Sequence, residues 1–383
     1  MIITDSIKYV GVNDKGIDLF EGQYVVPNGM AYNSYVVMDE KITVFDSVDA
    51  RFSSEWLNNI DTVLGSKTPE YFVVQHIEPD HSGSITAFMD KYPSAKIVSS
   101  ERCFVMMKNF YGDDYADRRV VVGENVALKT GEHEFVFVTA PMVHWPEVIV
   151  TFDKKDGVLF SADAFGKFGA LDADEDWACE ARRYYFGIVG KYGVQAQALL
   201  KKAAGLDIKI ICPLHGPILT ENLGYYLDLY NTWTTYGVET KGVVIAYTSV
   251  YGNTKKAVLK LADMLTEKGV RVTVTDLARD DMAEAVEDAF RHDKLVLATT
   301  TYNGEIFPFM RTFIDHLTER NFQNRTVAFI ENGSWAPMAA KVMKGMLENC
   351  KNITYTKNNV KILSALNSES EKSLTALAEE LSK

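Results

Sequence analysis

The segment 73–84, VVQHIEPDHSGS, concentrates groups that can bind a metal ion. His76, Glu78 and Asp80 alternate directly after an apolar run, and His81 follows Asp80. A loop between a strand and a helix can aim such side chains at points on either side of it. Imidazole and carboxylate groups are ligands for both zinc and non-haem iron. The spacing H-x-E-x-D-H therefore predicts a metal site and leaves the metal open.

Three further candidates lie near the ends of later apolar runs. His144 stands in TAPMVHWPE, Asp163 in LFSADAFG and His215 in ICPLHGPI. With the first loop they make four histidines and three carboxylates. Such a set suits two metal ions with three terminal ligands each and one bridging carboxylate. A lone histidine is more often a hydrogen-bonded polar group, so the remaining histidines are expected to bind no metal; they are His133, His292 and His316.

A second kind of site is predicted in YTSVYGNTKKAV, 247–258, which joins an apolar run to a helical pattern. Backbone N–H groups of such a loop, together with the start of the helix, can cradle a phosphate. The spacing is neither a Rossmann G-x-G-x-x-G nor a Walker P-loop. Taken alone, a Gly-Asn-Thr turn is more often only a helix cap. The candidate binding residues are Ser249, Val250, Tyr251, Gly252, Asn253 and Thr254.

Two further loops, 299–308 and 331–337, follow later apolar runs in the same region. In a parallel doubly wound sheet, ligands bind at the carboxyl ends of the strands. The candidates there are Thr300, Thr301, Tyr302, Asn303, Gly304, Asn332, Gly333, Ser334 and Trp335. The loop 249–254 resembles the S-x-x-G-N-T phosphate loop of flavodoxins, and this resemblance implies a flavin ring against which Tyr302 and Trp335 would pack. The alternative is that both aromatic residues belong to the core. A mononucleotide loop favours FMN over FAD, and no nicotinamide fingerprint is present.

The elements around these loops alternate regularly in the second half of the chain. Strands are predicted over 242–247, 270–277, 294–301, 325–333 and 352–363, and helices over 253–268, 281–291, 308–319, from about 337 and from 368. This alternation indicates an α/β domain with a parallel, doubly wound sheet, and five strands fit a flavodoxin-like fold.

The first half reads differently. Strands are predicted at 16–22, 34–40, 41–48, 70–76, 95–100, 134–141 and 157–164, with a helix over about 52–64. This mixture indicates an α+β sandwich. The pattern changes near 234–241, so we predict one domain over 1–238 and another over 239–383.

Composition excludes several other classes. The 383 residues carry a formal net charge of −12, which argues against nucleic acid or anionic membrane as the main partner. No apolar stretch approaches the length of a membrane span, and the first residues do not resemble a signal peptide. Four cysteines stand far apart without a C-x-x-C pair, so no rubredoxin-like or zinc-ribbon site is expected. We predict a cytoplasmic protein with buried free thiols.

The ligand set resembles the metallo-β-lactamase superfamily, whose usual loop reads H-x-H-x-D-H and holds zinc for hydrolysis. Glu78 stands where the second histidine of that loop would be. This variant resembles the flavodiiron proteins, or A-type flavoproteins, and the resemblance covers essentially the whole chain. It implies a metallo-β-lactamase-like αββα sandwich followed by the flavodoxin-like domain. It also implies that one iron is held by His76, Glu78 and His144, the other by Asp80, His81 and His215, and that Asp163 bridges them.

The physical case for iron is independent of this resemblance. A carboxylate in place of an imidazole makes the site harder and more negative, and both changes favour a metal that must reach the ferric state. The resemblance implies an oxidoreductase that reduces dioxygen to water, nitric oxide to nitrous oxide, or both, and so detoxifies these gases. Electrons would pass through FMN from a partner protein such as rubredoxin. The alternative is a zinc-dependent hydrolase with an appended flavodoxin domain.

The family resemblance carries further expectations about assembly and about the metal pocket. It implies a head-to-tail homodimer, or a dimer of such dimers. Tyr24, Asn28 and Trp145 lie in segments that resemble family stretches close to the irons. After Trp335, the segment Ala336-Pro337-Met338 departs from a glycine-richer family pattern, which leaves the flavin contacts there open. The preferred gas and the identity of the electron donor also stay open.

Overall fold

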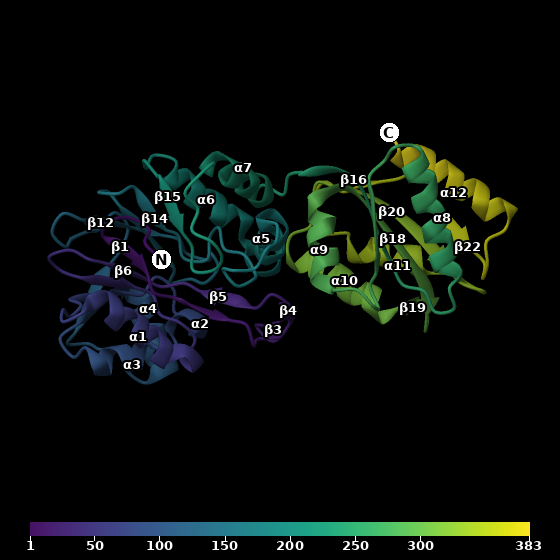
Figure 1. Cartoon of the computed structure of the whole chain (residues 1–383). Helices are drawn as coiled ribbons and strands as arrows, with labels where there is room; N and C mark the ends of the chain where they lie inside the picture. Colours follow the sequence, from purple (N-terminus) through teal and green to yellow (C-terminus); the bar gives the residue numbers. More distant parts are fainter. The chain divides into compact units, whose positions relative to one another are not determined.

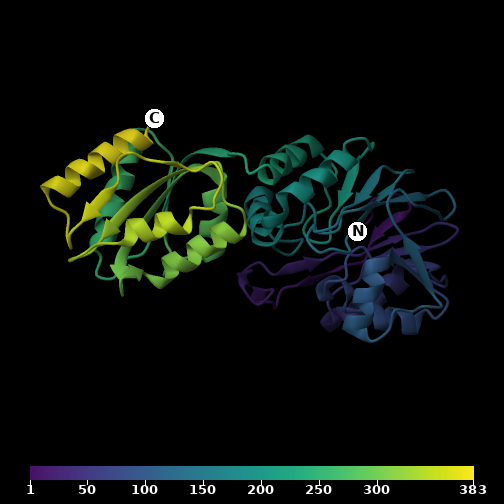
Figure 2. The same ribbon diagram turned by 180° about the vertical axis from the view of Figure 1, so that it is seen from behind.

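The computed structural model describes residues 1–383 and divides the chain into two compact units (Figure 1; Figure 2 is the view from behind). The N-terminal unit comprises residues 1–185 and 194–231, and the C-terminal unit comprises residues 186–193 and 232–383. No helix in either unit combines the length and the apolar character needed to cross a bilayer.

Two sheets form the centre of the N-terminal unit. The first has the spatial order β1 (Ile7–Tyr9), β6 (Tyr35–Val37), β7 (Thr43–Phe45), β8 (Tyr71–Val73), β9 (Lys96–Ser100), β10 (Arg119–Val122). The second has the order β11 (Ala127–Lys129), β12 (Glu134–Thr139), β13 (Ile149–Asp153), β14 (Val158–Phe160), β15 (Ile210–Cys212). Apolar side chains of both sheets share one core, in which the rings of Phe45 and Phe160 stack with centroids 4.1 Å apart. The sheets are therefore packed face to face.

Helices cover both outer faces of this pair of sheets (Figure 1). On the first sheet lie α1 (Ser53–Leu64), α2 (Pro79–Ser82), α3 (Ile85–Lys91) and α4 (Glu101–Tyr111); on the second lie α5 (Trp177–Tyr184), α6 (Gly193–Ala203) and α7 (Leu223–Thr234). In α1 the buried residues Trp56, Ile60 and Leu64 recur every fourth position and so lie on one face. The predicted αββα sandwich is confirmed.

The early strands are shorter than the sequence predicts. Of the expected strand 16–22, only Leu19–Phe20 is extended (β3), and it pairs with β4 (Tyr24–Val25). Glu21 and Gly22 have φ of 50° and 68° and form the turn between them. A second small pair joins β2 (Val12–Asp14) to β5 (Met30–Tyr32).

The C-terminal unit is built on a parallel sheet. Its spatial order is β17 (Val272–Asp276), β16 (Thr240–Tyr247), β18 (His292–Tyr302), β20 (Thr326–Asn332), then β21 (Thr354–Tyr355) and β22 (Val360–Ile362). This is the 2-1-3-4-5 order of flavodoxin-like sheets. The helices are α8 (Asn253–Glu267), α9 (Met282–Arg291), α10 (Pro308–Glu319), α11 (Ala339–Met346) and α12 (Ser368–Leu381). The predicted doubly wound α/β fold is confirmed.

The prediction of a single strand over 352–363 is wrong, because this segment forms two separate strands, β21 and β22. Between them the side-chain oxygen of Asn359 accepts a hydrogen bond from the Phe329 backbone at 3.1 Å. A side chain thus replaces the backbone acceptor of a continuous strand. All four cysteines are free, but only Cys103 and Cys212 are buried, so the expectation of buried thiols holds for two of them.

Candidate functional site

The seven predicted metal ligands come from four segments of the N-terminal unit. The loop after β8 carries His76 and Glu78 and leads into α2, where Pro79 takes the first helical position that suits proline. Asp80 and His81 follow within this short helix. The other three come from the second sheet: His144 lies between β12 and β13, Asp163 follows β14, and His215 follows β15.

One group consists of His76, Glu78, His144 and Asp163. The nearer Glu78 oxygen is 3.1 Å from His76 Nε2 and 3.0 Å from His144 Nε2. The Asp163 Oδ2 atom is 3.3 Å from each of the same two nitrogens. Two imidazoles and two carboxylates therefore point at one small volume.

A second group consists of Asp80, His81 and His215. Asp80 Oδ2 lies 3.2 Å from Nε2 of both histidines, and these two nitrogens are 3.0 Å apart. Asp163 also reaches this group, because its Oδ1 atom is 3.2 Å from His81 Nε2 and 3.7 Å from His215 Nε2. Asp163 thus turns one oxygen toward each group.

These residues fit a pair of metal ions by their own chemistry. The buried carboxylate oxygens of Asp80 and of Asp163 find no hydrogen-bond donor apart from the ligand imidazoles. Buried carboxylates gathered in one place are costly unless a cation meets them. Ligand atoms that bind one ion at about 2.1 Å and at right angles lie about 3 Å apart, which is the spacing seen in both groups.

Hydrogen bonds orient two of the imidazoles. His76 Nδ1 is 2.7 Å from Glu147 Oε1, and His215 Nδ1 is 2.8 Å from the Ala31 carbonyl oxygen. An acceptor at Nδ1 places the proton there and leaves the Nε2 lone pair facing the site. Glu147 was not singled out from the sequence, although it lies in the HWPE segment that carries His144.

Asp46 is hydrogen-bonded to Gln75, the residue directly before the first ligand, His76. Its carboxylate accepts hydrogen bonds from the Gln75 backbone at 2.7 Å and from the Gln75 side chain at 3.0 Å. Burial raises the pKa of Asp46 to about 6, and the Gln75 bonds oppose that rise. This residue was also missed, because nothing in the spacing of VFDSV links it to a loop some thirty positions later.

The loop that carries Asp163 has a strained backbone. Ala162 and Phe165 have φ of 49° and 66°, in the left-handed region that non-glycine residues seldom adopt. Such conformations persist where the surroundings hold them and are common at functional sites. Between these two positions, the Asp163 carboxylate contacts both ligand groups.

Interactions between the carboxylates and the imidazoles shift the pKa values of the site. Burial lowers the pKa of His144, but the Asp163 and Glu78 carboxylates outweigh burial and raise that pKa to about 9. Burial raises the pKa of Asp163, yet His76 and the neighbouring imidazoles hold it well below its usual range. The metal-free site therefore holds protons that a bound cation would displace.

Of the three residues predicted near the metal pocket, Trp145 has a ring contact with a ligand. The Trp145 ring stands edge-on to His76, with centroids 5.2 Å apart, and stacks on Phe110. Tyr24 is buried and packs on Phe168, with ring centroids 5.4 Å apart. Asn28 is exposed and donates a hydrogen bond to Glu175.

Glu21, on the β3–β4 hairpin, was not predicted as part of the site. Partial burial and the negative charge of Glu78 raise its pKa to about 7. The hairpin therefore brings one more carboxyl group into the electrostatic field of the ligand groups.

The C-terminal unit holds an open pocket of about 600 Å³ at the carboxyl ends of its strands. Most of the lining residues come from the three predicted loops, and Ser364 comes from the segment after β22; the full set is Ser249, Val250, Tyr251, Asn253, Thr254, Thr300, Thr301, Tyr302, Asn303, Gly304, Asn332, Gly333, Ser334, Trp335, Ala336, Met338 and Ser364. Gly252, also a candidate, is absent from the wall. It precedes α8 with φ of 85° and allows the tight turn.

The first loop of this pocket presents donors. Ser249 Oγ accepts from the backbone N–H groups of Gly252 and Lys255 at 3.1 and 3.2 Å, which shapes the loop around the start of α8. The remaining N–H groups at the helix start are available to an anion. The geometry therefore suits a phosphate ester.

The second and third loops differ in detail from the prediction. β18 continues to Tyr302 and turns back through Asn303 and Gly304, both with positive φ, into β19 (Glu305–Ile306). An Asn-Gly turn of this kind is typical of a tight hairpin. Ser364, which follows β22, was not among the candidates; its hydroxyl donates to Ser334 Oγ of the third loop at 2.8 Å.

Comparison with known families agrees with this division of the chain. A model described as the ODP family beta lactamase matches residues 30–216, and a flavodoxin domain model matches residues 244–362. An uncharacterized protein of Methanocaldococcus jannaschii is 28% identical over 91% of this chain and 89% of its own length. An anaerobic nitric oxide reductase flavorubredoxin of Vibrio vulnificus is 27% identical over 87% of this chain and 70% of its own length.

Solved structures share the whole architecture. Rubredoxin oxygen:oxidoreductase from Desulfovibrio gigas superposes with a TM-score of 0.91 at 26% identity, over 100% of this chain and 97% of that one. A mutant flavo di-iron protein from Thermotoga maritima gives a TM-score of 0.88 at 25% identity, over 98% and 95% of the two chains.

Proposed function

We propose that this chain, which belongs to the flavodiiron family, is an oxidoreductase that reduces dioxygen to water, nitric oxide to nitrous oxide, or both. The observation that carries the proposal is Asp163, whose two oxygens face two separate groups of imidazole and carboxylate ligands. The names of its relatives, a nitric oxide reductase flavorubredoxin and a rubredoxin oxygen:oxidoreductase, support the same reaction class.

The seven side chains would hold two iron ions in the N-terminal unit. His76, Glu78 and His144 would bind one ion, Asp80, His81 and His215 the other, and Asp163 both. Bound iron supplies a redox centre with an open position for a small oxidant. Glu147 holds His76 in the binding orientation, and the Trp145 ring packs edge-on against the His76 ring.

The pocket of the C-terminal unit would hold FMN. A flavin accepts electrons in pairs or singly and passes them on. The loop 249–254 and the first N–H groups of α8 would bind the phosphate, while Tyr302 and Trp335 stand at the wall where the ring would lie. The fit rests on helix-start donors for the phosphate and on two aromatic faces for the ring.

The electron donor is proposed to be a small redox protein such as rubredoxin. We also propose a head-to-tail homodimer, or a dimer of such dimers, in which the flavin of one chain serves the metal pair of its partner. Activity measured during serial dilution tests the dimer, since isolated monomers should lose gas reduction while keeping both cofactors. Undiminished turnover by monomers would contradict it.

The division into domains at 238/239 and a cytoplasmic location remain proposals. The boundary is supported by β16, which begins at Thr240. The location is supported by four free cysteines, which suit a reducing compartment.

The alternative of a zinc-dependent hydrolase is not favoured. Glu78 occupies its place between two imidazoles, and the second half of the chain matches a flavodoxin domain, which hydrolysis does not need. Elemental analysis after Glu78→His replacement tests this choice, because the variant should retain less iron and more zinc than the natural protein.

The decisive experiment joins cofactor content with reactivity. Purified protein should contain iron and FMN. The fully reduced protein, prepared anaerobically and then mixed with dioxygen or with nitric oxide in separate stopped-flow runs, should be reoxidised by at least one gas. Inertness to both gases in iron-loaded protein would overturn the proposal. Zinc content with hydrolytic turnover would support the alternative instead.

A further inference from the structure

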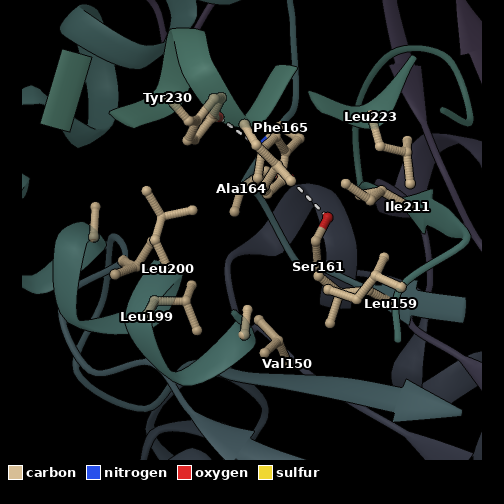
Figure 3. Close-up of a pocket in the computed structure, with 15 residues that line it drawn as sticks. Val150, Leu159, Ser161, Ala164, Phe165, Leu199, Leu200, Ile211, Leu223 and Tyr230 are labelled. Carbon is tan, nitrogen blue, oxygen red and sulfur yellow. Dashed lines mark hydrogen bonds between the residues drawn. The ribbon is translucent and has the colours of Figure 1, made fainter. Parts of the chain in front are cut away.

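An apolar cavity of about 50 Å³ lies in the N-terminal unit between the second sheet and helices α6 and α7 (Figure 3). A buried water needs only about 10–15 Å³, so the space is large enough for a small molecule. Leu199 and Leu200 from α6 surround it together with Val150 and Leu159 from the sheet. No charged side chain lines it.

The few polar groups of the wall are already satisfied. Ser161 donates its hydroxyl hydrogen to the Ala164 carbonyl at 2.7 Å. The Tyr230 hydroxyl oxygen accepts a hydrogen bond from the Phe165 backbone at 2.5 Å (dashed lines in Figure 3). A water molecule needs two or more free polar partners, so the cavity is expected to stay dry.

The inner end of the cavity touches the metal-ligand loops. Val143 and Ala164 belong to its wall, and each is at most 4% exposed. Val143 precedes the ligand His144, and Ala164 follows the ligand Asp163. Consecutive Cα atoms lie about 3.8 Å apart, so the wall reaches within one residue of two ligands.

The outer end of the cavity approaches the protein surface along α7. Leu223 is half-buried, and Leu227, also in the wall, is 37% exposed. The cavity therefore extends from a partly exposed rim to the backbone beside the ligand groups. The wall residues of α6, Ala196, Leu199, Leu200 and Ala203, recur at the spacing of one helix face.

The dimensions and polarity restrict the occupant. A charged or strongly polar ligand would lose its hydration without gaining partners. A lipid or a flat aromatic molecule is too large, since benzene is bound in a cavity of about 150 Å³. A small uncharged gas meets both limits.

We propose that this cavity admits and holds the gaseous substrate, so that dioxygen or nitric oxide reaches the ligand groups by an apolar route separate from water. The assignment of a substrate route rests on the proposed function. The affinity of the cavity for an apolar gas does not depend on it, and the two can be tested apart.

The first experiment uses xenon as the probe, in pressurised crystals of the full-length protein with its cofactors. Xenon should occupy the cavity in the natural protein. Ala196→Leu fills the cavity from α6 and should abolish the xenon site. Ala198→Leu is the matched control, because Ala198 lies on the exposed side of the same helix and outside the wall. Absence of xenon from the natural protein would overturn the proposal.

The second experiment measures the second-order rate constant of nitric oxide with the fully reduced protein. Ala196→Leu should lower it roughly fivefold, because the gas must wait for side-chain movement to pass. Ala198→Leu should leave it unchanged, and both variants should keep the natural iron and FMN contents. A filled cavity with an unchanged rate would show the cavity to be a packing defect and overturn the route.

The two hypotheses fail in different ways. Normal gas reduction without xenon binding would refute the cavity alone. Xenon binding in a protein that reduces neither gas would refute the proposed function, and the route with it.

Discussion

The two candidate sites of this chain are built in opposite ways. The metal site brings charged side chains into the interior, where His76, His81 and Asp163 are fully buried. The flavin pocket is open and formed by small polar groups and loop backbone, and two of its aromatic residues, Tyr251 and Trp335, are 92% and 83% exposed. One site depends on the chemistry of individual side chains, the other on the shape of loops.

This difference predicts how strongly a single substitution affects each site. Buried carboxylates and imidazoles stabilise the fold only as a balanced set, since removal of one charge leaves its partners unpaired. An open pocket distributes its contacts over many weak donors, so single substitutions cost less. We therefore expect replacements in the metal site to remove the cofactor, and those in the flavin pocket only to weaken binding.

The largest effect is expected from Asp163→Asn. The amide keeps the shape but loses the negative charge that both ligand groups share. Metal content should fall from a pair of ions per chain to one or none, and gas reduction should be lost. Elemental analysis and the visible spectrum measure this, and the FMN content should be unchanged.

Asp172→Asn is the control for that change, because Asp172 is an exposed aspartate of the same unit that pairs with Lys15. It should keep both ions. Full metal content in Asp163→Asn would contradict the proposed difference between the two sites, because the metal site would then tolerate the loss of the charge that both ligand groups share.

A smaller loss is expected from Glu147→Gln. Glu147 accepts from the Ile77 backbone at 3.1 Å and lies 2.7 Å from His76 Nδ1, so it positions a ligand without binding the metal. Loss of such a partner costs about 10- to 100-fold in metal affinity. Competition with a chelator measures the dissociation constant.

The exposed Glu124→Gln variant of the same unit should show no change in metal affinity. If Glu147→Gln also left metal affinity unchanged, while the potential of the iron pair stayed at its natural value, the orienting role of Glu147 would be wrong.

In the flavin pocket, Asn253→Asp should weaken FMN about tenfold. The new carboxylate stands at the first position of α8, where it repels a phosphate by about 1 kcal/mol or more in water. The helix itself should not suffer, because an acidic residue near its start is favourable. Fluorescence titration of the apoprotein gives the dissociation constant.

Riboflavin, which lacks the phosphate, provides the control ligand for this variant. Its affinity should be the same for Asn253→Asp and the natural protein. Equal weakening of both ligands would mean that the loop 249–254 does not receive the phosphate.

The smallest effect is expected from Trp335→Ala, about threefold in FMN affinity. Stacking on a flavin contributes about 1 kcal/mol at most for a side chain that is 83% exposed without it. Phe309→Ala, exposed but outside the pocket wall, should have none. A loss of FMN affinity of more than about a hundredfold would mean that Trp335 dominates binding. The flavin pocket would then depend on one side chain, as the metal site does.

Much of the fold could be predicted because its signals are local. Helices α8, α9 and α10 begin and end within about two residues of their predicted bounds, since their apolar spacing and flanking residues are read directly from the chain. The break in the strand at 352–363 could not be foreseen, because it lies where the Phe329 backbone donates a hydrogen bond to the side chain of Asn359, thirty residues away.

The candidate site shows the same limit. The H-x-E-x-D-H loop could be recognised from the sequence, because the ability to bind a metal depends on residue type and spacing. Glu147 and Asp46 are two acidic residues among 52, and only their distances to His76 and Gln75 separate them from the rest. Glu21 and Ser364 likewise acquire their roles from turns whose geometry the spacing does not specify.

By itself, then, the amino-acid order determined the two fold classes, the seven candidate ligands and the candidate phosphate loop, because these depend on periodicity and on side-chain chemistry. Only the tertiary structure decided that Asp163 faces two groups at once, that Glu147 orients His76, and that an apolar cavity reaches the ligand loops from α7. The physical reason is that distance, burial and empty space are properties of segments brought together by packing, and no short stretch of chain contains them.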